Sequence, residues 1–119
     1  MQTTLVFGAS LKPDRYSNLA IKRLLEKNIS TVAFGLRTGW VDKVQIKTNF
    51  SELPKIDTVT LYLNSERQKQ YYDTIIALSP RRVIFNPGTE NPDFYKLLEN
   101  EGIKVEVSCT LVLLATNQF

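Results

Sequence analysis

The segment from Gly8 to Asn18 has the residue types and order of a loop that binds phosphate. Gly8 follows a short apolar run and lets the backbone turn sharply. The small side chains of Ala9 and Ser10 leave their backbone amides open to an anion. A helix that begins near Ser17 adds unpaired N–H groups and the positive end of its dipole. We therefore expect a phosphate site here, the alternative being an ordinary connection between a strand and a helix.

Basic side chains support this prediction, while the spacing excludes two common nucleotide-binding motifs. Lys12 and Arg15 place positive charge within the loop. The pattern is not G-x-G-x-x-G, because Ser10 and Pro13 stand at the second and third glycine positions. It also lacks the Gly-Lys-Ser/Thr of a Walker A loop.

The residues after the second predicted strand favour a ribose that carries a phosphate. An NAD site places an acidic residue at this point, whereas this chain has Gly35-Leu36-Arg37. A guanidinium binds phosphate through paired hydrogen bonds. Arg37 therefore suits the 2′-phosphate of NADP or the 3′-phosphate of coenzyme A (CoA), and NAD is disfavoured.

The inventory of reactive side chains favours a binding module over an enzyme. The sequence contains no histidine and one cysteine, Cys109. Nucleophiles activated by histidine and most catalytic zinc sites are thereby excluded. Free cysteines are usually buried and inert. We therefore expect no catalytic residue and no bound metal.

Apolar, β-branched runs that end at turn-forming residues predict the strands that position these groups. They are Thr3–Phe7, Thr31–Phe34, Asp57–Leu63, Arg82–Phe85 and the edge strand Ile103–Val107, with a further short strand around Val44 and Ile46. Apolar residues at helical spacing predict the helices between them. These are a helix from Ser17 to about Asn28, one with capping-box spacing at Ser65 and Gln68, one framed by Asn91, Pro92 and Gly102, and a short one from Leu111 to Ala115 docked on the sheet.

This alternation of strands and helices predicts an α/β fold of Rossmann-like, three-layer type, with a mostly parallel sheet flanked by helices on both faces. In such folds, the loops at the carboxyl ends of the strands build the ligand crevice. The segments after Phe7, Phe34, Leu63 and Phe85 are therefore the places to look for a site.

Length and composition are those of an ordinary globular domain. The chain has 119 residues with 43% hydrophobic and 23% charged side chains, and no linker divides it, so we expect a single domain over residues 1–119. The lack of a long apolar run and of a signal-peptide pattern predicts a cytoplasmic protein without a membrane association. A net charge of +3 is too small to argue for nucleic acid. Lys22, Arg23 and Lys27 are accordingly interpreted as a solvated helix face rather than an RNA site.

Several segments together resemble one known family, the small stand-alone CoA-binding proteins of Rossmann type, related to the CoA-binding domain of the succinyl-CoA synthetase alpha subunit. The resemblance covers nearly the whole chain. It rests on Gly8-Ala9-Ser10 with Pro13, Arg15-Tyr16-Ser17-Asn18, residues 60–64 (Thr-Leu-Tyr-Leu-Asn), residues 83–91 (Val-Ile-Phe-Asn-Pro-Gly-Thr-Glu-Asn) and residues 109–112 (Cys-Thr-Leu-Val). One departure is the loop at Gly35-Leu36-Arg37, where the family usually has Asn-Pro-Arg or a similar tripeptide.

The resemblance implies a nucleotide site spread over the ends of four strands. It implies that the loop after the first strand contacts phosphate, that Arg37 lies near the adenosine phosphate, and that later loops line the path of the pantetheine arm. Together with the basic residues of the loop, the candidate cofactor-binding residues are Gly8, Ala9, Ser10, Lys12, Arg15, Tyr16, Ser17, Asn18, Arg37, Asn64, Asn86, Pro87 and Gly88. From the residues alone, Asn64 and Asn86 also suit a structural role where strands end, and Pro87-Gly88 suits a plain type II turn.

Three functions stay open at this point. The first is binding of CoA or an acyl-CoA without chemistry of its own, because ligation and acyl transfer in the related enzymes need further domains. The second is an NADP-linked oxidoreductase, for which tyrosine or lysine would have to donate the proton. The third is a protein-interaction domain that keeps the fold without a ligand. The partner expected first is a small nucleotide ligand, and a homodimer or another protein partner stays open.

Overall fold

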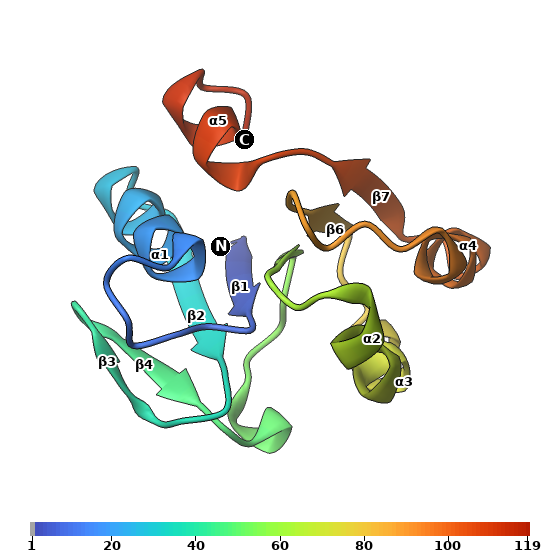
Figure 1. The fold of residues 1–119 in the computed structure, drawn as a ribbon, viewed down its shortest axis with the longest axis horizontal. Helices are drawn as coiled ribbons and strands as arrows, with labels where there is room; N and C mark the ends of the chain where they lie inside the picture. The colour runs from blue at the N-terminus through green and yellow to red at the C-terminus, as the bar shows by residue number, and fades with distance from the viewer. Residues whose placement is uncertain (1) are drawn as a thin grey trace.

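The computed structural model describes residues 2–119 and is built around one seven-stranded sheet (Figure 1). The strand order is β3-β4-β2-β1-β5-β6-β7, and each neighbouring pair is parallel except the antiparallel pair β3 and β4. The strands are β1 (Thr3–Phe7), β2 (Ser30–Phe34), β3 (Gly39–Val41), β4 (Val44–Lys47), β5 (Thr58–Leu61), β6 (Arg82–Phe85) and β7 (Lys104–Val107).

Helices cover both faces of this sheet. The α-helices are α1 (Tyr16–Glu26), α2 (Ser65–Gln68), α3 (Tyr72–Ala77), α4 (Pro92–Asn100) and α5 (Thr110–Ala115), with 3₁₀ turns η1 (Phe50–Glu52) and η2 (Lys69–Tyr71). The apolar residues of α1 and α5 pack in one cluster with β1, β2 and the β3–β4 hairpin. Those of α3 and α4 pack in a second cluster on the opposite face. Figure 1 shows the same division, and it confirms the three-layer, Rossmann-like fold.

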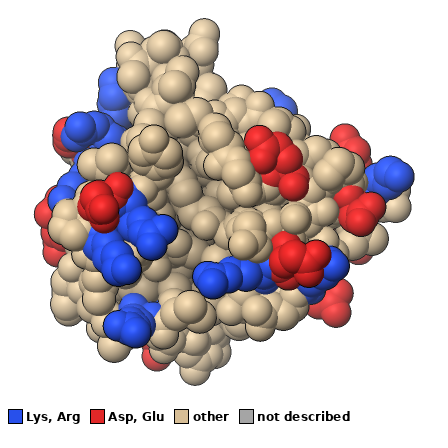
Figure 2. Space-filling model, in the orientation of Figure 1, with Lys and Arg blue, Asp and Glu red and all other residues tan. Residues whose placement is uncertain are grey.

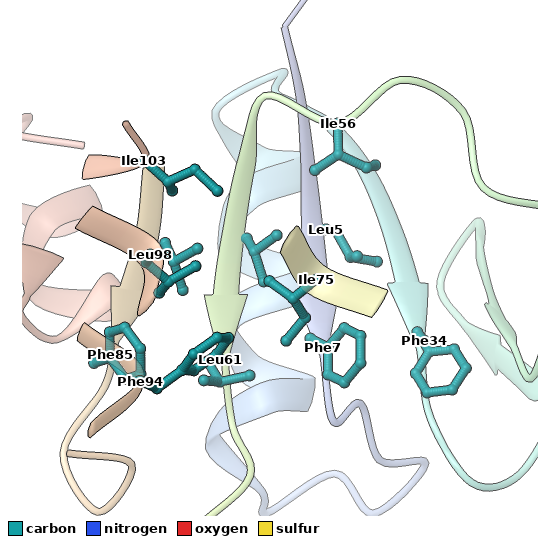
Figure 3. Packing of buried hydrophobic residues seen from close by; sticks show 12 residues of the cluster. Leu5, Phe7, Phe34, Ile56, Leu61, Ile75, Phe85, Phe94, Leu98 and Ile103 are labelled. Carbon is teal, nitrogen blue, oxygen red and sulfur yellow. The ribbon is translucent and has the colours of Figure 1, made fainter. Parts of the chain in front are cut away.

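The two clusters follow from the alternation of side chains along the central strand. Leu5 and Phe7 of β1 belong to the cluster under α3 and α4, whereas Val6 points to the cluster under α1. Large residues stand at the last position of each inner strand, including Phe7, Phe34 and Phe85. Figure 3 shows their rings gathered towards the arrowhead end of the sheet. The carboxyl edge of the sheet therefore has a rigid, close-packed floor.

The topology reverses direction at the middle of the sheet. After β1 the chain forms β2, β3 and β4 on one side, and then crosses to β5, β6 and β7 on the other. The loops that leave β1 and β5 consequently diverge to helices on opposite faces. Ligands of open α/β sheets bind at such a switch point, outside the carboxyl ends of the strands.

Two local features differ from the sequence-based expectation. The β3–β4 hairpin, with a turn in which Asp42 has φ +51°, adds a strand that the sequence analysis did not predict. The cap of α2 is Asn64, whose side chain accepts from the Arg67 amide at 2.9 Å, so Ser65 is the first helical residue and not the cap. Within residues 2–119, no helix combines the length and apolar character needed to cross a bilayer.

Candidate nucleotide-binding site

A broad cleft of about 1000 Å³ lies at the switch point. Its walls come from the loop after β1, the exit of β2, the β5–α2 connection and the turn after β6. The lining residues are Gly8 to Lys12, Asp14 to Ser17, Phe34 to Arg37, Tyr62 to Asn64, Arg67, Tyr71 and Pro87 to Thr89. The cleft thus spans the ends of β2, β1, β5 and β6, which are consecutive neighbours in the sheet.

The loop after β1 turns at Gly8, as the sequence predicts. Its φ of +93° lies in the region that favours glycine. The amides of Gly8 and Ala9 both donate to the Phe34 carbonyl, at 2.9 and 2.8 Å. The Ala9 amide, which the sequence predicted to be open to an anion, is therefore already hydrogen-bonded within the protein and is not available to a ligand. The amides of Ser10 and Leu11 donate no hydrogen bond within residues 2–119 and remain available to a ligand.

The side chain and carbonyl of Ser10 fix the shape of the loop. Ser10 Oγ accepts from the Lys12 amide at 3.1 Å, and Ser10 O accepts from Asn18 Nδ2 at 3.0 Å. No side chain caps α1 at Arg15, and the first turn of α1 contains no acidic residue. The helix therefore presents its first amides without an anion supplied by the protein itself.

The exit of β2 approaches this loop very closely. The Gly35 amide donates to the Lys47 carbonyl at 3.0 Å, which aligns the exit with β4. A Cβ atom on Gly35 would collide with the Ala9 carbonyl oxygen. Only glycine fits this contact, and beyond it Leu36 and Arg37 emerge at the mouth of the cleft, both exposed.

The charge around the cleft is mostly positive. Its basic residues are Lys12, Arg15, Arg37 and Arg67, against Asp14 as the one acidic lining residue in the described chain. In Figure 2, blue side chains lie on two sides of a tan hollow near the centre of the face, over the loops after β1 and β2 and over α2. Such a cleft attracts a ligand that carries several negative charges.

Buried amides hold the walls in place. Gln68 is fully buried, and its Nε2 donates to the carbonyls of Leu63 and Thr89, both at 2.8 Å. Its Oε1 accepts from Asn91 Nδ2 at 2.9 Å. One side chain thus ties together the loops after β5 and β6, on which two parts of the cleft wall stand.

Asn86 has a similar role one layer below the cleft. Its Nδ2 donates to Thr60 Oγ1 at 2.8 Å and to the Leu61 carbonyl at 2.9 Å, while its Oδ1 accepts from the Thr110 amide at 2.8 Å. All its hydrogen-bonding groups are therefore engaged by β5 and the start of α5. The following Pro87-Gly88 forms a turn closed by the Thr89 amide on the Asn86 carbonyl at 3.0 Å, with Gly88 at φ +93°.

The structure brings most of the residues predicted from the sequence into one cleft. Those that line it are Gly8, Ala9, Ser10, Lys12, Arg15, Tyr16, Ser17, Arg37, Asn64, Pro87 and Gly88. Asn18 and Asn86 do not line it, because both are buried against the backbone beneath. Asn64 lines the cleft and also caps α2, so the structural role allowed for it is present.

Among the lining residues that the sequence analysis did not predict as site residues are Arg67, Tyr71 and Thr89. Tyr71 stacks edge-on against Phe7 and Phe34, with ring centroids 5.1 and 5.8 Å apart. An aromatic residue at helical spacing gives no sign of this role. Arg67 is the more important omission, because it lies in the first turn of the helix capped by Asn64, close after a strand, and its position could have been read from the sequence.

Reactive groups are few at the cleft. Tyr62 lines it, and burial raises the pKa of its hydroxyl to about 12. Cys109 lies half-buried before α5 and does not line the cleft. No group of acidic or cysteine side chains among residues 2–119 has the arrangement of a metal site.

Comparison with protein families matches residues 2–115 to the CoA binding domain. The chain belongs to this CoA-binding domain family. A crystal structure of an uncharacterized protein superposes with a TM-score of 0.95 at 39% identity, covering 100% of this chain and 98% of the other. No curated protein sequence matches the chain.

More distant structures share the fold of this CoA-binding domain. The structure of cell-free ID.343 from Thermus thermophilus has a TM-score of 0.89 at 20% identity and covers 99% of this chain and 90% of its own. A hypothetical protein from Pyrococcus horikoshii OT3 has a TM-score of 0.85 at 22% identity, with coverages of 97% and 82%. At these identities the likeness is one of fold.

Proposed function

We propose that the protein binds CoA, or an acyl-CoA, in the cleft at the carboxyl edge of the sheet and catalyses no reaction by itself. The observation that carries the proposal is the set of four basic residues that line a cleft at the topological switch point, in a chain of the CoA-binding domain family. CoA carries a diphosphate and a 3′-phosphate on a long, otherwise neutral molecule. A cleft that spans four strand ends and is rich in Arg and Lys matches this distribution of charge.

The diphosphate is assigned to the loop after β1. The free amides of Ser10 and Leu11 and the uncapped start of α1 supply N–H donors, and the 11-residue helix adds its dipole. Lys12 and Arg15 are exposed at the rim and supply mobile positive charge. Together they form an anion site to which the protein contributes no competing carboxylate in the first turn.

The adenosine 3′-phosphate is assigned to Arg37. Its guanidinium forms no ion pair or hydrogen bond with any described residue, so a ligand phosphate has no protein carboxylate to displace there. Arg37 follows the end of β2, where nucleotide-binding sheets hold the ribose of an adenosine. A guanidinium grips a phosphate with two parallel, charge-assisted hydrogen bonds.

The pantetheine arm is assigned to the far half of the cleft. Tyr62, Leu63 and Asn64 follow β5, and Pro87 and Gly88 form the turn after β6. These residues combine apolar surface with a few hydrogen-bonding groups, which suits a neutral chain that carries two amides. The thiol or acyl end of the ligand would then lie near the β6 turn.

Binding without chemistry is supported by the side chains available at the cleft. The chain has no histidine, and its one thiol, Cys109, is not a lining residue. The raised pKa of Tyr62 makes its hydroxyl a poor proton donor at neutral pH. This argues against the reductase alternative, although Arg37 would suit the 2′-phosphate of NADP equally well.

A thermal-shift experiment tests the proposal and separates the alternatives. A ligand at about 100 times its dissociation constant adds roughly 2.7 kcal/mol of stability, which raises Tm by several degrees. We expect such a shift with CoA and little with NAD or NADPH. A shift with NADPH alone would support the reductase, and no shift with any of them would favour the protein-interaction domain. Native mass spectrometry of freshly purified protein adds an independent readout, since retained CoA appears as added mass.

A further inference from the structure

Arg67 lines the cleft, but its guanidinium takes part in no interaction that stabilises the fold. It is exposed, and its side chain makes no hydrogen bond or ion pair with any residue of the described range 2–119. Its neighbours behave differently, because Glu66 and Lys69 pair with each other at 3.1 Å on the outer side of the same turn. The guanidinium of Arg67 is therefore left free to meet a ligand.

The backbone that carries Arg67 is held firmly on both sides. The Asn64 side chain accepts from the Arg67 amide at 2.9 Å, and the next residue, Gln68, is anchored in the interior by its bonds to Leu63 and Thr89. A long flexible side chain on a fixed base keeps its reach while losing less freedom on binding. The base of the Arg67 side chain is thus fixed at the cleft wall, while the guanidinium itself is free to move.

Arg67 stands on the opposite side of the cleft from the loop after β1. That loop leads to α1 on one face of the sheet, whereas α2 lies on the face of α3 and α4. The two sides meet closely, since the Tyr62 amide donates to the Phe7 carbonyl at 2.9 Å. A Cβ atom on Gly8 would lie 3.0 Å from Leu63 Cδ2. A group held over Gly8 thus has Ser10 and Leu11 on one side and α2 on the other.

We propose that Arg67 binds the diphosphate of the ligand from the α2 side and faces the amides of Ser10 and Leu11 across it. The proposal rests on the proposed CoA site and divides its charges between two arginines. Arg37 follows β2 and Arg67 follows β5, with β1 between them, so the two strands from which they emerge are about two strand spacings, roughly 10 Å, apart. Arg37 binds the 3′-phosphate, and Arg67 binds the diphosphate, which is present in both CoA and dephospho-CoA.

Calorimetric titration of CoA and dephospho-CoA into the wild type and Arg67→Gln tests this division. We expect Arg67→Gln to bind both ligands more weakly by the same factor, about 10-fold, the size expected for a lost charge-assisted contact. The loss should shrink in about 0.5 M salt, because screening weakens a contact between charges. Lys69→Gln, which removes a charge two residues away that does not line the cleft, should leave both affinities within about twofold.

Other outcomes overturn the inference in distinguishable ways. If Arg67→Gln weakens CoA but not dephospho-CoA, Arg67 reads the 3′-phosphate instead. If the loss is unaffected by salt, the side chain packs against the neutral arm, and if neither affinity changes, Arg67 has no part in binding. In these three cases the proposed CoA site stands. If the wild type binds neither ligand, the inference fails together with the proposed function.

Discussion

The carbonyl oxygen of Ala9 occupies the space in which a side chain at Gly35 would stand. Through this contact, the loop that follows β1 rests directly on the exit of β2. The two segments proposed to hold the diphosphate and the 3′-phosphate are therefore one rigid unit. A substitution at Gly35 should therefore displace both segments.

Gly35→Ala should destabilise the protein and weaken its binding of CoA. The added methyl group meets backbone, which cannot swing aside, so the loop has to move, at a cost of about 1–3 kcal/mol. Urea unfolding and calorimetry measure the two effects.

Gly102→Ala is the matched control, because Gly102 has φ +75° and open space around it, far from the cleft. It should lose about 1 kcal/mol through backbone strain and keep its affinity. Full CoA affinity in Gly35→Ala would show that the loop contact is irrelevant to binding.

Ser10→Leu should impair binding more than folding. Leucine removes the bond from the Lys12 amide and places a large side chain beside the free amides of Ser10 and Leu11. We expect a clear loss of CoA affinity with an unchanged far-UV circular dichroism spectrum. Ser10→Ala removes the same hydrogen bond without the bulk and should bind far better than Ser10→Leu. Equal affinity of Ser10→Leu and the wild type would mean that the phosphate lies elsewhere.

Gln68→Leu should cost about 2–4 kcal/mol of unfolding free energy. The substitution leaves the carbonyls of Leu63 and Thr89 without their donor in a buried place, and such groups are expensive when unpaired. Gln70→Leu, at an exposed position two residues later, should stay within about 0.5 kcal/mol of the wild type. Chemical denaturation of the wild type, Gln68→Leu and Gln70→Leu measures the three free energies of unfolding. Equal stabilities would remove Gln68 as the link between the two loops.

The sequence predicted the fold well where elements are long or strongly patterned. The runs ending at Phe7, Phe34 and Phe85 combine β-branched and aromatic residues with a turn-forming successor, and these strands end there in the structure. Strand β4 was expected around Val44 and Ile46, whereas β3 was missed because three residues around Trp40 are too few for a periodic signal. The capping residue was misplaced by one position, since Asn64 and Ser65 are both good caps and composition does not rank them.

The candidate site was predictable only in part, for a physical reason. Sequence patterns place residues at the ends of strands, and parallel strands bring those ends together, so the segments around Ser10, Arg37 and Pro87 could be expected in one cleft. Which amide is free depends on tertiary partners. The Ala9 amide is occupied by the Phe34 carbonyl, a contact that exists only after β1 and β2 pair. The direction of Arg67 likewise depends on where α2 starts.

Stability should fall in acid through an ion pair at the opposite edge of the sheet. The hydrogen bonds from the Arg81 guanidinium, at 3.1 Å, lower the pKa of Asp57 below its usual value of 3.8. A lowered pKa in the folded state contributes stability that is present above the unfolded pKa. This contribution is lost as the pH falls through the pKa of the folded state.

Unfolding free energies measured from pH 5 down to about 2 should therefore fall less steeply for Asp57→Asn than for the wild type. Asp42→Asn, at an exposed position without an ion pair in the described chain, should keep the wild-type slope. Identical slopes for all three proteins would rule out this contribution.

The contact between Arg37 and the 3′-phosphate is the most direct test of the site as a whole. Calorimetric titration of CoA and dephospho-CoA into the wild type and Arg37→Ala measures it in four experiments. The wild type should prefer CoA by roughly 10-fold, the lower end for a charge-assisted contact because Arg37 is exposed. Arg37→Ala should lose that preference and bind dephospho-CoA almost as the wild type does, so that the two losses do not add. A mutant that still prefers CoA by the wild-type margin, or a wild type that binds neither ligand, would contradict the account.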